Sequence, residues 1–573
     1  MNSTYSSRFW KKSWDEGLDD LDPKIWDISF PEALQDTFKS FPDKMALAYM
    51  GLEITFSQLD KWANSFANML IENGFEKGDV VGINIPNIPE YVITVVGALR
   101  AGCIVSGVSP LLSDVQMHYQ INDLGAGKKK VALVTLNAIF EHRLTPIASK
   151  LPDLKLAIST SVIGAFPKDQ QDKIRAVREL PWGEVKPIEG IKVLDFWDDI
   201  MNKISSDPVD VKILPDDIAY IQYTGGTTGP PKGALLTHKN AVSDLLLMQT
   251  WLGWEKGKGL AMSGFPFFHI AGLFFCENCL YLGWSQVLLA DPRDTVHICN
   301  EMKKYQPTVL ANVPSLYQLL IKTKKFKRLD HSILDVCISA AAPFPAESQK
   351  QLESMVGVGK LLEFYGMTET SPLTVGNPYK GKRKLGSIGL PVLNTELKLV
   401  DPTTNEEVPL GEPGEICVKG PMVMKGYHNK PEETAHVMDS DNFLHTGDVA
   451  IMDKEGYLRI VDRTKDMIIV SGFKVFSAKL EDTLTKHPAI GMIATIGIPN
   501  PDRPGSEIVK AFIQLDPKYE YDGNEVALKK DITKFAKENC SPYEVPKIIE
   551  FSEELPLTVV GKVDKKVLRP PKQ

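Results

Sequence analysis

A glycine-rich stretch that carries no charge until its lysine is the segment of this sequence best suited to chemistry. Residues 223–233 read YTGGTTGPPKG and follow an apolar run, 218–223, that is expected to be a strand. The glycines free the backbone to point N–H groups at an anion. Threonine hydroxyls add hydrogen-bond donors, and the lysine adds positive charge. We therefore predict a polyphosphate site formed by Thr224, Gly225, Gly226, Thr227, Thr228, Gly229 and Lys232.

This loop differs from the two commonest nucleotide-binding loops. A P-loop requires Ser or Thr directly after its lysine, whereas Gly233 follows Lys232 here. The spacing also lacks the GxGxxG pattern of dinucleotide-binding folds. An ordinary surface turn seldom holds three threonines, four glycines and a lysine within eleven residues. The pattern therefore favours phosphate binding of another kind.

The loop resembles the signature [ST]-[ST]-G-[ST]-[ST]-G-x-P-K-G of the adenylate-forming superfamily, which comprises acyl-CoA synthetases, aryl-CoA ligases and luciferases. It departs from that signature only at Gly225, where one hydroxyl is lost. Further motifs of the superfamily follow in the same order: EFYGMTET at 363–370, GEICVKG at 414–420, LHTGD at 444–448, IVDRTKD at 460–466 and GK at 561–562. The resemblance covers nearly the whole chain from about residue 30.

The resemblance implies a reaction in two halves that requires ATP, Mg²⁺ and CoA. A carboxylate attacks the α-phosphate of ATP to give acyl-AMP and pyrophosphate, and a thiol, usually that of CoA, then displaces AMP. We expect an AMP-forming acyl-CoA synthetase whose partners are small molecules. Two alternatives stay open: an aryl-acid–CoA ligase of the 4-coumarate type, and a free-standing adenylation enzyme that loads an acyl carrier protein. A non-catalytic nucleotide-binding regulator is disfavoured by Glu369, Asp448 and Lys562.

The superfamily's motifs assign roles to individual residues of this chain. Glu369 matches the carboxylate that binds Mg²⁺, and Thr368 matches a contact to the α-phosphate. Lys562 matches the lysine that reaches the acyl carboxylate and the α-phosphate, and His269 matches a residue beside that carboxylate. The other residues implied at ATP or AMP are Ala341, Ala342, Glu363, Phe364, Tyr365, Asp448, Ile460 and Arg463. Of these, Tyr365 would stack on adenine, and Asp448 would accept hydrogen bonds from both ribose hydroxyls.

The same resemblance places the walls of the acyl pocket on small or apolar residues: Ile270, Ala271, Val313, Ala341, Phe364, Gly366 and Met367. An uncharged hydrophobic tail fits such walls, because burial contributes about 0.8 kcal/mol per CH₂. Relatives that take acetate carry a bulky tryptophan where Gly366 stands, so a glycine there would leave room for a longer chain. Phe364 would narrow or redirect the channel. We expect a medium- or long-chain fatty acid, ahead of an aryl acid.

The two half-reactions need different groups at one carbon atom, which implies a movable C-terminal domain. By resemblance the hinge is Lys465, and the residues that would face CoA after the rotation are Ser471, Gly472 and Phe473. We therefore expect an adenylation domain at residues 1–464 and a mobile lid domain at residues 465–573.

Alternating helices and strands must position these motifs. Residues 55–72 carry apolar side chains at helical spacing, and another helix is expected after Pro89. Apolar or β-prone runs expected as strands are 79–85, 131–135, 396–400, 414–418 and 457–460. We predict an α/β fold: a large N-terminal domain of two parallel-sheet α/β subdomains plus a small β-rich subdomain after Gly386, followed by a small mobile α+β C-terminal domain.

Composition agrees with a globular multidomain protein: 573 residues, 43 % of them hydrophobic, with a net charge of −8. That balance argues against a nucleic-acid binder, and no integral membrane segment is expected. Seven sparse cysteines indicate a reduced protein, with Cys276 and Cys279 packed in the core. The N-terminus lacks a signal peptide, so we expect cytoplasmic localisation; peripheral membrane association and a homodimer stay open. Trp10, Trp14 and Trp26 are expected to pack on the main body rather than on lipid.

Overall fold

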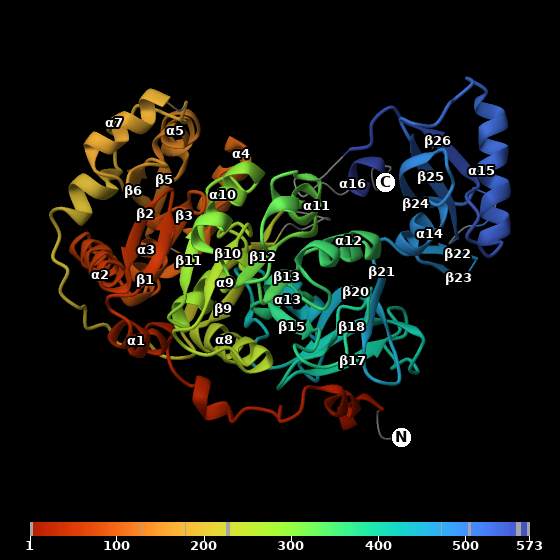
Figure 1. The fold of residues 1–573 in the computed structure, drawn as a ribbon, viewed down its shortest axis with the longest axis horizontal. Coiled ribbons are helices and arrows are strands. Elements are labelled where there is room, and N and C mark those ends of the chain that lie inside the picture. Colours follow the sequence, from red (N-terminus) through yellow and green to blue (C-terminus); the bar gives the residue numbers. More distant parts are fainter. Residues whose placement is uncertain are drawn as a thin grey trace.

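The computed structural model describes residues 4–127, 129–177, 179–224, 230–471, 473–501, 503, 506–556 and 563–569. Figure 1 shows a large α/β body, a β-rich part that adjoins it, and a smaller C-terminal domain at the right of the view. The N-terminal segment runs along the lower edge of the large body. Within the described ranges, no helix combines the length and the apolar character needed to cross a bilayer.

One of the two large sheets contains the strand that leads into the phosphate loop. Its order is β19-β9-β8-β4-β3-β5-β6-β7. Its strands are β3 (Val80–Asn84), β4 (Ile104–Gly107), β5 (Val131–Leu136), β6 (Leu154–Thr160), β7 (Lys192–Asp195), β8 (Ile218–Thr224), β9 (Lys232–Thr237) and β19 (Gly426–Tyr427). Neighbours from β8 to β7 are parallel, while β9 pairs antiparallel with β8 and β19.

The other large sheet carries the motif at 363–370. Its order is β16-β15-β14-β13-β12-β10-β11-β1-β2, with parallel pairing from β14 to β1. Its strands are β1 (Met45–Tyr49), β2 (Leu52–Thr55), β10 (Leu260–Ser263), β11 (Ser285–Leu288), β12 (Val309–Asn312), β13 (Val336–Ser339), β14 (Leu361–Gly366), β15 (Leu373–Gly376) and β16 (Leu390–Pro391). The strands β2, β15 and β16 join the edges in antiparallel pairs.

Two smaller units complete the sheet structure. An antiparallel sheet in the order β17-β18-β20-β21 is formed by β17 (Glu396–Val400), β18 (Pro413–Lys419), β20 (Leu444–Met452) and β21 (Leu458–Arg463). The C-terminal part holds the hairpin β22 (Ile468–Val470) and β23 (Phe473–Val475), and the sheet β24 (Ile490–Pro499), β25 (Glu507–Leu515) and β26 (Ile548–Phe551). The predicted boundary at 464/465 falls between β21 and β22 and stays a prediction.

Helices cover the sheets on both faces (Figure 1). They are α1 (Phe30–Ser40), α2 (Phe56–Glu72), α3 (Pro89–Arg100), α4 (Asp114–Leu124), α5 (Asn137–Ile139), α6 (Thr145–Ile147), α7 (Lys168–Val177), α8 (His238–Leu252), α9 (Ile270–Tyr281), α10 (Thr295–Tyr305), α11 (Pro314–Lys322), α12 (Ala346–Val356), α13 (Pro431–Val437), α14 (Ser477–Leu484), α15 (Glu525–Asn539) and α16 (Lys565–Leu568). Cys276 and Cys279 lie buried on α9, which confirms their interpretation as core residues.

The predicted fold class is confirmed, and so are the elements expected from local pattern. The helix expected at 55–72 is α2, and Thr55 and Gln58 form a capping box at its start. The strands expected at 79–85, 131–135 and 396–400 are β3, β5 and β17. Hydrophobic periodicity is a local signal, and it was sufficient to locate these elements.

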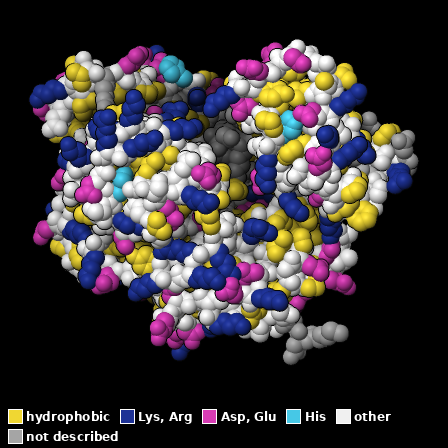
Figure 2. All heavy atoms as spheres, turned by 45° about the vertical axis from the view of Figure 1, so that its right-hand side comes forward, with side chains coloured by type: hydrophobic (Ala, Val, Ile, Leu, Met, Phe, Trp, Pro, Cys, Tyr) yellow, Lys and Arg dark blue, Asp and Glu magenta, His cyan; other side chains and the backbone are white. Residues whose placement is uncertain are grey.

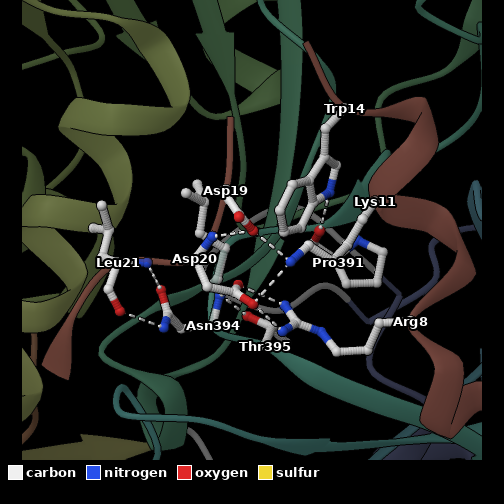
Figure 3. Close-up of polar contacts among 10 residues, drawn as sticks. Arg8, Lys11, Trp14, Asp19, Asp20, Leu21, Pro391, Asn394 and Thr395 are labelled. Atoms are coloured by element: carbon white, nitrogen blue, oxygen red, sulfur yellow. Dashed lines mark hydrogen bonds and ion pairs between the residues drawn. The ribbon is translucent and has the colours of Figure 1, made fainter. Parts of the chain in front are cut away.

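The N-terminal segment lies against the β-rich part of the molecule (Figure 3). Trp14 donates its indole N–H to the carbonyl oxygen of Pro391 at 2.9 Å. The amide side chain of Asn394 pairs with both backbone groups of Leu21, at 2.9 and 3.0 Å. Trp10 and Trp26 are buried as well. The expectation that the three tryptophans pack on the main body is therefore confirmed.

Candidate active site

A cavity of about 870 Å³ lies where the two large sheets and the β-rich sheet meet. It opens beside the ends of β8 and β14, in keeping with the rule that ligands bind at the carboxyl ends of parallel strands. Figure 2 shows that one face of the molecule is hollowed between two lobes. The predicted site residues that line the cavity are Thr224, Lys232, His269, Ile270, Ala271, Ala341, Phe364, Tyr365, Gly366, Met367, Thr368, Glu369, Arg463 and Lys465.

Other predicted residues lie elsewhere or outside the described residues. Those described but not lining the cavity are Val313, Ala342, Glu363, Asp448, Ile460, Ser471 and Phe473. The Glu363 carboxylate accepts a hydrogen bond from Gln349 at 2.7 Å, and burial raises its pKa to about 7. Val313 packs at the start of α11 between two core clusters. Gly225, Gly226, Thr227, Thr228, Gly229, Gly472 and Lys562 fall outside the described residues.

Glu369 is a buried carboxylate at the wall of the cavity. It follows β14, and its Oε1 accepts a hydrogen bond from the Tyr427 hydroxyl at 2.7 Å. Burial raises the pKa of Glu369, while the bond from Tyr427 and the charge of Lys232 act in the opposite direction. A carboxylate held in this way gains stability when a cation binds to it. In the described part of the chain no group of three or more His, Cys, Asp or Glu is arranged to hold a metal.

Asp448 lies directly behind the cavity wall and joins two strands to the motif at 363–370. Its Oδ2 accepts the Tyr365 hydroxyl at 2.8 Å, and its Oδ1 pairs with Arg463 Nε at 3.0 Å. Each carboxylate oxygen retains a further acceptor site. The neighbouring loop is held by Glu415, whose Oε1 accepts the backbone N–H of Gly447 at 2.9 Å. The sequence motif contained Glu415, but its positioning role depends on the fold.

Lys232 lies beside the cavity with two partners that sequence reasoning did not identify. Its ammonium group forms an ion pair with Glu433 and lies 5.2 Å from the centre of the Tyr427 ring. Glu433 belongs to α13, about two hundred residues further along the chain. A bound polyphosphate would compete with Glu433 for this lysine.

His269 begins α9 and faces the cavity. Its Nδ1 accepts the backbone N–H of Ala271 at 3.3 Å, which leaves Nε2 as the protonated nitrogen of the neutral ring. Desolvation lowers the pKa of His269, so the neutral ring is favoured near pH 7. His269 can thus donate one hydrogen bond from Nε2 into the cavity.

The loop before His269 is fixed by helix α3 of the opposite subdomain and by the loop that precedes this helix. The Asn87 side chain donates to the carbonyl of Phe265 at 2.9 Å and accepts the N–H of Phe267 at 2.8 Å. Tyr91 donates its hydroxyl to the Phe267 carbonyl at 2.9 Å. At Gly107 an added Cβ would lie 2.4 Å from a backbone oxygen of this loop. No sequence signal pointed to these contacts.

Part of the cavity lining is apolar, and we call this part the apolar branch. It comprises Met248, Phe265, Phe274, Phe275, Ile338 and Leu373, together with the predicted wall residues other than Val313. The structure adds a second reason for glycine at 366, and the expected role of Gly366 in the length of the acyl pocket stays a prediction. A Cβ at this position would lie 1.6 Å from the carbonyl oxygen of Pro372, so glycine is required by the close approach of two backbone segments.

A prediction concerns the bond between Tyr427 and Glu369. Tyr427→Phe removes a hydrogen bond that lowers the pKa of Glu369, so this pKa should rise further. If ionised Glu369 is needed, the acidic limb of the pH profile of kcat/KM for pyrophosphate release should shift to higher pH. Tyr379→Phe, which removes a surface hydroxyl bonded to Asp335, is the matched control. An unshifted acidic limb in Tyr427→Phe would refute this coupling.

Comparison with protein families is in line with this geometry. The model described as AMP-binding enzyme matches residues 34–428, and the model described as AMP-binding enzyme C-terminal domain matches residues 479–562. The chain therefore belongs to the AMP-binding enzyme family.

Curated relatives and solved structures agree with this assignment. A long-chain-fatty-acid–CoA ligase of Escherichia coli O6:H1 is 35 % identical over 548 residues, 94 % of each chain. One of Bacillus subtilis is 36 % identical over 546 residues, 92 % of each chain. The structure of ATP-bound MatB from Rhodopseudomonas palustris covers 95 % of this chain and 98 % of its own, with a TM-score of 0.79 and 26 % identity. The anthranilate CoA ligase AuaEII with anthranoyl-AMP covers 96 % and 98 %, with a TM-score of 0.78 and 27 % identity.

Proposed function

We propose that this protein is an AMP-forming acyl-CoA synthetase that activates a hydrophobic acid, a medium- or long-chain fatty acid. The observation that supports this best is that Lys232 and Glu369 line the same cavity as the apolar branch, which includes Phe274. Such a cavity has polar groups for a nucleotide and apolar surface for a tail. The relatives named long-chain-fatty-acid–CoA ligases favour a fatty acid over an aryl acid.

In the first half-reaction, ATP would lie between the phosphate loop and the β-rich sheet. Lys232 would leave Glu433 to bind phosphate, and Asp448 would accept the ribose hydroxyls while Tyr365 contacts adenine. His269 would donate its Nε2–H to the acyl carboxylate. Oriented donors and cations of this kind stabilise the charge that develops at the α-phosphate. Lys562, outside the described residues, would contact the same carboxylate and phosphate.

The residues present fit a Mg²⁺ ion shared with the phosphates of ATP. Mg²⁺ is usually held by one or two carboxylates plus phosphate oxygens and water, which needs no cluster of protein ligands. Glu369 would supply the carboxylate, and its burial favours a cation partner. When bound, the ion would neutralise charge on the phosphates.

In the second half-reaction, CoA would displace AMP after the C-terminal domain has turned about Lys465. Ser471 and Phe473, predicted to face CoA, are not among the described residues at the cavity. The Phe473 ring instead stacks on Tyr543, with 4.7 Å between ring centres. Rotation about the 464/465 boundary would let the hairpin of β22 and β23, which carries Phe473, approach the acyl-AMP. The lid of this proposal comprises residues 465–573.

The test is a pyrophosphate-release screen with saturated acids of graded chain length and with aryl acids. We expect Mg²⁺-dependent release to be greatest with medium or long chains. Consumption of CoA would exclude a carrier protein as the main acceptor, whereas acylation of added carrier protein without CoA consumption would favour it. Greater activity on aryl acids would overturn the fatty-acid assignment. Localisation in the cytoplasm and a homodimer remain predictions that fractionation and light scattering can check.

The apolar branch can be tested by a substitution at Ala271, a small residue that lines the cavity next to His269. Ala271→Trp should fill the branch and lower kcat/KM for a sixteen-carbon acid by about 100-fold, because several buried CH₂ groups lose their place. Short acids should keep most of their activity. Ala271→Ser is the control for the position itself. Equal loss on short and long acids would show that the tail does not run along α9.

A further inference from the structure

One stretch of this acidic protein carries charged side chains of positive sign only, and the exposed Glu53 lies beside it, where it accepts the Tyr305 hydroxyl at 3.2 Å. From residue 303 to residue 328 the chain has seven Lys or Arg and no Asp or Glu, although the net charge of the whole chain is −8. We call these residues the basic face: Lys303, Lys304, Lys322, Lys324, Lys325, Lys327 and Arg328. All are exposed except Lys325, which is half-buried. Within the described ranges, none of the seven forms an ion pair with a carboxylate.

The two parts of the basic face, residues 303–304 and residues 322–328, lie on neighbouring elements. Lys325 hydrogen-bonds the side chain of Asn300 on α10, which places the segment after α11 beside that helix. Phe326 is buried in the same core cluster as Ile298 and Met302 of α10. The cations of α10 and of residues 322–328 therefore lie on neighbouring elements joined by one core.

Exposed apolar side chains lie on α10 and α11, which carry three of the cations, and in two further loops. Leu319 is 46 % exposed on α11, one turn before Lys322, and Val296 is 56 % exposed on α10. Ile333 and Val358 are 46 % and 90 % exposed. Their two loops are adjacent, because Lys360 donates to the carbonyl oxygens of residues 331 and 332. Cations beside exposed aliphatic side chains are typical of surfaces that bind at a lipid interface.

We propose that the basic face docks this protein on an anionic lipid bilayer. Single-stranded nucleic acid is less suited, because it binds by stacking on successive exposed aromatic rings. Phe326 and Tyr317 are fully buried here, and Tyr305 is half-buried and bonded to Lys304. Each cation close to an anionic membrane strengthens binding by about fivefold, and salt weakens the effect. Docking would hold the ligase at a surface in which long-chain acids dissolve, a consequence that rests on the proposed function.

The experiment measures flotation of the full-length protein with vesicles. Vesicles of phosphatidylglycerol and phosphatidylcholine are compared with vesicles of phosphatidylcholine alone, at low and high salt. We expect binding to the anionic vesicles at low salt, and its loss at high salt. The variant Lys322→Glu/Lys324→Glu/Lys327→Glu should bind at least tenfold more weakly. The matched control Lys530→Glu/Lys534→Glu/Lys537→Glu makes the same charge change on exposed residues of α15 and should bind like the wild type.

Several results would overturn the proposal. These are equal binding to both vesicle types, an equal loss in the two triple variants, or a lack of binding to anionic vesicles at low salt. Preferential binding of the basic face to RNA in competition with the vesicles would also overturn it. Ligase activity on a short soluble acid is measured separately. An inactive protein that still binds anionic vesicles would contradict the proposed function and leave the docking surface standing.

Discussion

Glu369→Gln is expected to reduce pyrophosphate release by at least about 100- to 1,000-fold, with the fold intact. The glutamine keeps the shape and the hydrogen bond from Tyr427 but loses the only charge that Glu369 brings to the cavity. Loss of one group that stabilises charge in a transition state typically costs about 3–4 kcal/mol. Single-turnover release with ATP, Mg²⁺ and a long-chain acid measures the effect.

The control for Glu369→Gln is Glu432→Gln, the same substitution on the exposed face of α13. It should retain full activity. Thermal unfolding of both variants should match the wild type or, for Glu369→Gln, exceed it, because a buried carboxylate without its cation is destabilising. If pyrophosphate release by Glu369→Gln stayed within about twofold of the wild type, Glu369 would not be the metal ligand.

Lys465→Pro is expected to separate the two half-reactions. Lys465 lies between β21 and β22, and its carbonyl accepts Arg569 at 3.0 Å. A proline would fix φ near −65° and restrict Thr464, whose backbone N–H bonds to Gly447 at 2.9 Å. The rotation of the lid should then be blocked, so acid-dependent pyrophosphate release should persist while acyl-CoA formation falls about 100-fold or more.

Two further variants make this test specific. Lys465→Ala leaves the backbone free and should retain most acyl-CoA formation. Lys562→Ala should lose adenylation and still convert supplied acyl-AMP to the thioester. The two half-reactions are measured as pyrophosphate release and as thioester formed from acyl-AMP. Equal damage to both half-reactions in Lys465→Pro and Lys562→Ala would rule out a rotation about residue 465.

The sequence by itself determined the family, the fold class and fourteen of the residues that line the cavity. Helix α2 was predictable because its capping box and its apolar spacing lie within eighteen residues, from Thr55 to Glu72. The motifs at 223–233 and 363–370 were informative for a similar reason, since each is a short run of fixed residue types. Local patterns of this kind can be read from the order of residues alone.

Only the tertiary structure decided which groups hold those motifs in place. Tyr427 bonds to Glu369 across 58 positions of sequence, and Asn87 bonds to the loop before His269 across about 180. The need for glycine at 366 likewise depends on the path of the backbone at Pro372. Such contacts follow from how two sheets and a third unit pack, and a single hydroxyl or amide carries no signal of its distant partner. The residues suited to chemistry could therefore be recognised in short stretches of the sequence, whereas their positions in space were set by long-range packing.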